Sequence, residues 1–110
     1  MDAKFIQKQT FSLDSQAIEE VKTRAFETST QRFRLCLHKN IKQQTHEMLI
    51  GFTQKSYMPP HRHPKEKSES YLVLEGNMDV YIFDDSGLPI KRYSLSPQTT
   101  GKNFLFRLNG

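Results

Sequence analysis

The sequence predicts an all-β fold, a sandwich or a closed barrel, preceded by one helix. Three observations lead to this prediction. The chain has 110 residues, the length of a single domain. Only one segment near the N-terminus has apolar residues at helical spacing. From residue 32 onward, short apolar runs alternate with turn residues, a pattern typical of β sandwiches and barrels.

The helix is expected over residues 12–29, where Ser12 or Asp14 can cap its first turn. Its apolar positions recur at helical spacing and are Ile18, Val21, Ala25 and Phe26. We therefore divide the chain into an N-terminal helical segment, residues 1–30, and a β-barrel, residues 31–110.

Short runs of strand-forming residues follow the helix, and the predicted strands are residues 33–37, 45–53, 69–75, 78–83, 89–95 and 103–108. Gly76-Asn77 is a strong turn signal, so strands 69–75 and 78–83 are expected to pair as a hairpin. Residues 84–87 form the next turn. Pro59-Pro60 interrupts the strands because proline cannot donate to a sheet ladder.

The charge pattern indicates an ordinary solvated surface. Lys and Arg number 16 against 12 Asp and Glu, a net charge of +4, but the basic residues are scattered along the chain. No DNA-reading helix or RNA-stacking motif is present, so no nucleic-acid partner is expected. No stretch has the length of a membrane span, and Cys36 is the only cysteine. We therefore expect no membrane association and a cytoplasmic location.

Two histidines and a glutamate are the candidate ligands of a metal ion. His61 and His63 point to the same side of an extended segment, because side chains alternate faces there. Glu69 opens the next predicted strand and can return a carboxylate to the same point. Two imidazoles and a carboxylate suit a first-row divalent metal (Zn, Fe, Mn or Ni) and leave coordination positions open.

These residues resemble the first motif of the cupin superfamily, with His61, His63, Glu69 and Gly76 in its places. Lys55 stands where that motif has its leading glycine, and the gap from histidine to glutamate is one residue longer than usual. The longer pattern from residue 13 to residue 95 is similar to the WbuC branch of the cupins. This resemblance implies a jelly roll, or double-stranded β-helix, that holds the metal. The histidine of the second cupin motif would fall just past Gly110, so a truncated form or strands supplied by a partner subunit are both open.

The WbuC-like resemblance implies a metal-binding protein of cell-surface polysaccharide (O-antigen or lipopolysaccharide) or sugar metabolism. A metal-dependent sugar isomerase or epimerase fits Lewis-acid chemistry. The alternatives are a non-catalytic module that binds a sugar or phosphosugar and an iron-dependent dioxygenase with a facial triad. The exposed edges of an unclosed barrel favour a homodimer.

Further polar and aromatic residues are candidates for contact with a small-molecule ligand. Arg32 and Arg34 share a strand face and can bind a phosphate or carboxylate. His38 follows an apolar strand and can line a cavity. Tyr57 and Tyr71 are expected near the metal, where either can donate a proton.

Overall fold

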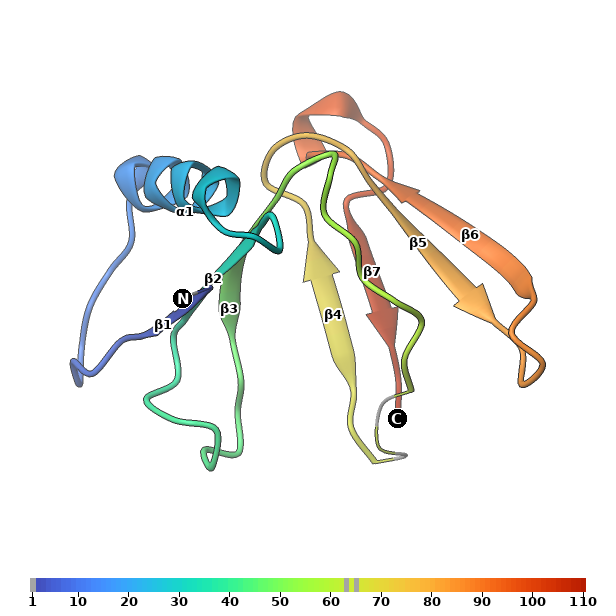
Figure 1. The fold of residues 1–110 in the computed structure, drawn as a ribbon, viewed down its shortest axis with the longest axis horizontal. Helices are drawn as coiled ribbons and strands as arrows, with labels where there is room; N and C mark the ends of the chain where they lie inside the picture. The colour runs from blue at the N-terminus through green and yellow to red at the C-terminus, as the bar shows by residue number, and fades with distance from the viewer. Residues whose placement is uncertain (1, 63, 65) are drawn as a thin grey trace. The chain divides into compact units, whose positions relative to one another are not determined.

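Seven strands and one α-helix follow one another along the residues described by the computed structural model, which are 2–62, 64 and 66–110 (Figure 1). The chain divides into two compact units, the first ending at Met58 and the second beginning at Pro59. Each unit has its own strand pairing and its own apolar core.

The first unit is built on a three-stranded sheet with the order β1-β2-β3. Strand β1 (Ala3–Phe5) runs parallel to β2 (Arg32–Cys36), and β3 (Met48–Phe52) pairs with β2 in the antiparallel sense. Side chains alternate along β2, so Phe33 and Leu35 are buried on one face while Arg34 is exposed on the other.

Helix α1 (Ser15–Glu27) covers one face of this sheet (Figure 1). It begins at Asp14, whose side-chain oxygen accepts hydrogen bonds from backbone amides of the first turn at 3.0 and 3.4 Å. Val21 and Ala25 lie one turn apart and are fully buried against Phe33 and Leu35. Val21 and Ala25 of the predicted apolar stripe thus lie in the core of the first unit, whereas Phe26, which was predicted with them, is 68% exposed.

Gly51 lets β3 approach α1 closely. A Cβ at this position would lie 2.7 Å from the backbone oxygen of Val21, which is shorter than a normal contact. The absence of a side chain at Gly51 therefore sets the distance between helix and sheet.

The second unit consists of two separate antiparallel pairs. Strand β4 (Glu69–Leu72) pairs with β7 (Leu105–Leu108), and β5 (Met78–Phe83) pairs with β6 (Pro89–Leu95). A short 3-10 helix, η1 (Gln98–Thr100), lies between β6 and β7. The two pairs share one apolar cluster whose buried members are Val73, Leu95 and Phe106.

The tight turn between β5 and β6 is held by the side chain of Asp84. Its Oδ1 accepts hydrogen bonds from the Ser86 amide at 3.0 Å, the Ser86 hydroxyl at 2.7 Å and the Leu88 amide at 2.9 Å. Gly87 has a φ of 88°, in the left-handed region that favours glycine. This turn was predicted correctly from residues 84–87.

The predicted all-β fold is wrong. The described residues form an α+β structure with one helix and three small sheets, and they contain no closed barrel, jelly roll or double-stranded β-helix. The expected hairpin of residues 69–75 and 78–83 is also absent, because β4 pairs with β7 and β5 pairs with β6. A turn signal is local, whereas the pairing follows from which strands can bury their apolar faces together.

Candidate functional site

His61 lies on the segment that leads into β4, and its ring is exposed. Its Nδ1 is 3.2 Å from the carbonyl oxygen of Pro59. A carbonyl oxygen can only accept, so this contact assigns the proton to Nδ1. In a neutral ring this contact places the lone pair on Nε2, the arrangement found in histidines that bind metals.

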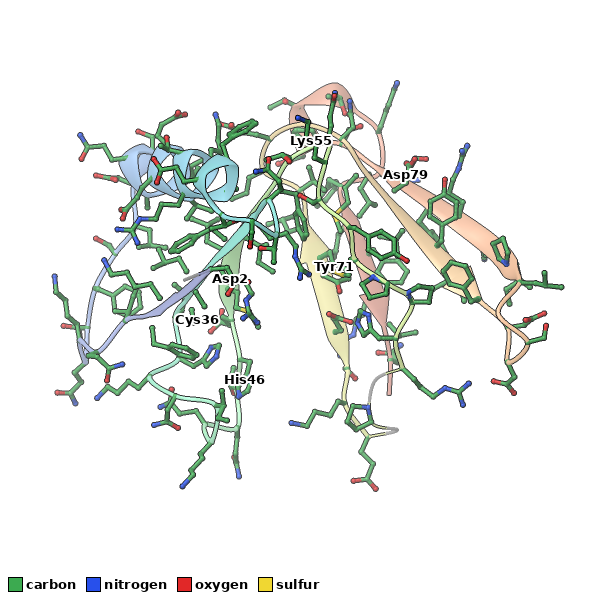
Figure 2. The ribbon with its side chains drawn as sticks, in the orientation of Figure 1. Asp2, Cys36, His46, Lys55, Tyr71 and Asp79 are labelled. Carbon is green, nitrogen blue, oxygen red and sulfur yellow. The ribbon has the colours of Figure 1, made fainter. Side chains whose placement is uncertain are left out.

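Glu69 is the first residue of β4, where it is half-buried and lies opposite Leu108 of β7. Its carboxylate accepts a hydrogen bond from the hydroxyl of Tyr71. The two residues are two positions apart on one strand, so their side chains project from the same face. Figure 2 shows Tyr71 on β4.

Tyr71 remains protonated and therefore acts as the donor in this pair. Burial raises the pKa of its hydroxyl well above its usual value, and the hydrogen bond to Glu69 and the negative charge of Glu69 raise it further. Its ring stacks on Phe106 with centroids 6.1 Å apart. The apolar core of the second unit thus positions the Tyr71 hydroxyl, which contacts Glu69, the candidate metal ligand.

Arg62 adds a contact that the sequence analysis did not find. Its guanidinium donates to the Asp85 carboxylate at 2.8 Å and links the segment of His61 to the turn between β5 and β6. Both side chains are largely exposed, so the pair contributes little stability. Only their positions in the fold bring these residues together, since they are 23 residues apart in the chain.

His63 and Lys65 lie outside the described residues. Within residues 2–62, 64 and 66–110, no group of three or more His, Cys, Asp or Glu side chains is placed to hold a metal ion. The predicted set of His61, His63 and Glu69 lies partly outside these residues, because His63 is one of its three members. The metal site therefore stays a prediction.

The other predicted ligand-binding residues belong to the first unit. Arg34 forms an ion pair with Asp2 at 3.9 Å, while the Nε of Arg32 is buried without a hydrogen-bond partner. Tyr57 is exposed, and it follows β3 near the end of the unit. The structure brings together Glu69 and Tyr71 from the predicted set.

His38 is buried in the connection between β2 and β3. Its Nδ1 donates to the carbonyl oxygen of Glu47 at 3.2 Å, and its ring stacks on His46 with centroids 4.2 Å apart. Phe5 contacts the same ring edge-on at 5.4 Å. These contacts give His38 a packing role in the first unit.

Fold and site together define an α+β domain in which a histidine-bearing segment leads into a strand that begins with a glutamate. Comparison with known families matches residues 13–95 to the family described as Domain of unknown function (DUF6016), and the chain belongs to this family. No curated protein and no solved structure matches the chain. No helix in the described part of the chain is both long and apolar enough to cross a membrane.

The resemblance to the cupin superfamily and its WbuC branch is therefore wrong. The matching family is a different one, and the described residues do not close a barrel. Four positions with suitable spacing (His61, His63, Glu69 and Gly76) make a short pattern, and a polar loop followed by a strand satisfies it without a barrel. The implied roles in polysaccharide and sugar metabolism lose their basis with the resemblance.

Proposed function

We propose that this chain binds one divalent metal ion through His61, His63 and Glu69. The observation that carries the proposal is the hydrogen bond from His61 Nδ1 to the Pro59 carbonyl, because it orients the ring and makes Nε2 the coordinating atom of the neutral form. Glu69 opens β4 in the same unit as His61 and supplies a half-buried carboxylate.

The donor set agrees with a first-row transition metal such as Zn, Fe, Mn or Ni. Two imidazole nitrogens and one carboxylate oxygen are borderline ligands that these ions accept. Three protein ligands leave coordination positions open for a small-molecule ligand. A metal bound in this way would supply a Lewis acid to an oxygen atom of that ligand.

A cytoplasmic location is part of the proposal. Cys36 is the only cysteine of the chain, and it is buried as a free thiol in β2. Protein thiols persist in reducing compartments, whereas small secreted domains commonly depend on disulfides. Location of the tagged full chain by cell fractionation tests this part separately.

The test of metal binding is the metal content of protein purified without chelators and without nickel affinity resin, measured by plasma mass spectrometry. We expect close to one equivalent of metal in the wild type and a near-complete loss in the His61→Ala/His63→Ala double variant. Glu69→Gln should lower the metal content as well, because an amide is a poorer ligand than a carboxylate.

Two matched variants control for nonspecific binding. His46→Ala removes an exposed histidine of the first unit, and Glu66→Gln neutralises an exposed glutamate near the site. Both should keep the wild-type metal content. A folded wild type without metal, which also takes up none of the four metals on dialysis, would refute the proposal.

A further inference from the structure

The hydrogen bond between Tyr71 and Glu69 joins a buried framework to a proposed metal ligand. Tyr71 is directly opposite Phe106 in the pairing of β4 with β7, and the two rings stack with an interplanar angle of 20°. Phe106 in turn contacts the ring of Tyr93 on β6 at 5.1 Å. Three aromatic rings from three strands therefore fix the position of the Tyr71 hydroxyl.

The Tyr71 hydroxyl orients the Glu69 carboxylate. A carboxylate is planar, so a hydrogen bond to Oε1 of Glu69 sets the orientation of the whole group, including Oε2. Glutamate has three rotatable side-chain bonds, and ordering them on metal binding costs entropy. A hydrogen bond that already orders the side chain reduces that cost.

We propose that Tyr71 is a positioning residue for the metal site, which holds the Glu69 carboxylate in the orientation that a divalent ion requires. This inference rests on the proposed function. Partners of this kind, which contact a ligand residue and not the metal itself, typically change metal affinity by about 10-fold to 100-fold.

The variant Tyr71→Phe tests the inference because it keeps the stacked ring and removes only the hydroxyl. The probe is Co²⁺, whose visible absorption reports both occupancy and coordination geometry, with affinity measured by competition against a chelator. We expect Tyr71→Phe to bind Co²⁺ about 10-fold to 100-fold more weakly than the wild type and with an altered spectrum. Tyr93→Phe is the matched control, since it removes a hydroxyl from the same core cluster without contacting Glu69, and it should bind like the wild type.

A double-mutant cycle separates positioning from a general loss of structure. Glu69→Asp keeps the carboxylate but retracts it from the Tyr71 hydroxyl, so adding Tyr71→Phe to Glu69→Asp should cost little further affinity. If the affinity losses of the two single variants instead multiply in the double variant, Tyr71 acts without Glu69 and the inference is overturned.

The possible failures are distinguishable. If the wild type binds Co²⁺, Glu69→Gln weakens the binding and Tyr71→Phe does not, the metal site stands and the role of Tyr71 is refuted. If the wild type binds neither Co²⁺ nor any of Zn, Fe, Mn and Ni, the proposed function fails and the inference fails with it.

Discussion

Replacement of Gly51 by alanine should destabilise the first unit, although alanine is normally the better residue. The added Cβ would lie 2.7 Å from the carbonyl oxygen of Val21, 2.9 Å from its Cγ1 and 3.1 Å from its carbonyl carbon. Two of these three atoms are helix backbone, so no change of rotamer relieves the clash. Gly51 does not have a positive φ, which means that the cost comes from lack of space alone.

The magnitude follows from opposing terms. Overpacking a well-filled core costs about 1–3 kcal/mol, because α1 must move away from the sheet and loosen the contacts of Val21 and Ala25. A Gly→Ala change also lowers the conformational entropy of the unfolded chain, which stabilises the folded state by about 0.4–1 kcal/mol. We therefore expect a net loss of about 1–2 kcal/mol in the free energy of unfolding.

Urea unfolding followed by circular dichroism checks this value, with a midpoint expected to fall by roughly 0.5–1.5 M. Hydrogen exchange across α1 (Ser15–Glu27) assigns the loss to the first unit. The control compares Val21→Ala with Val21→Ala/Gly51→Ala. Val21→Ala removes Cγ1 but keeps the carbonyl, so most of the cost of Gly51→Ala should remain. A Gly51→Ala variant at least as stable as the wild type would refute the argument.

Two further predictions concern polar side chains that organise the backbone. Asp14→Ala removes the cap of α1 and should lower the free energy of unfolding by about 1 kcal/mol, measured by urea unfolding against a control variant of the exposed Asp79, Asp79→Ala. Asp84 has a pKa below its usual value, chiefly because of the Ser86 hydroxyl and then the Leu88 amide. The stabilisation of the fold by the ionised Asp84 carboxylate should therefore be complete above about pH 4 and decline as the pH falls through the lowered pKa of Asp84. The stability difference between wild type and Asp84→Asn, followed from about pH 7 to about pH 2, should shrink on acidification, and a difference that grows would contradict this reasoning.

The elements that the sequence predicted well are those with strong local signals. Asp14 and the spacing of Val21 and Ala25 predict α1, and the structure shortens the expected residues 12–29 to Ser15–Glu27. Strands β5 and β6 have the predicted bounds, because a turn of Asp and Gly separates two runs of strand-forming residues. Strand β1 was missed, since a strand of three residues has too few positions to show a pattern.

In the candidate site too, the features with local signals were predicted and the contacts between side chains were not. Residue types and spacing predict His61, His63 and Glu69 as ligands, and residue parity alone places Tyr71 on the same strand face as Glu69. The hydrogen bond between Tyr71 and Glu69 and the ion pair of Arg62 with Asp85 depend on rotamers and on distant segments. Local sequence contains neither kind of information.

The sequence by itself determined where the helix and most strands lie, how their apolar faces alternate and which residues have the chemistry of metal ligands. Only the tertiary structure decided which strands pair, and therefore that the chain forms three small sheets instead of one closed barrel. The physical reason is that propensity and periodicity act over a few neighbouring residues, whereas pairing depends on distant faces becoming buried together. Strand β4 shows this most clearly, because it pairs with the distant β7 (Leu105–Leu108) and not with residues 78–83, which the turn at Gly76-Asn77 predicted.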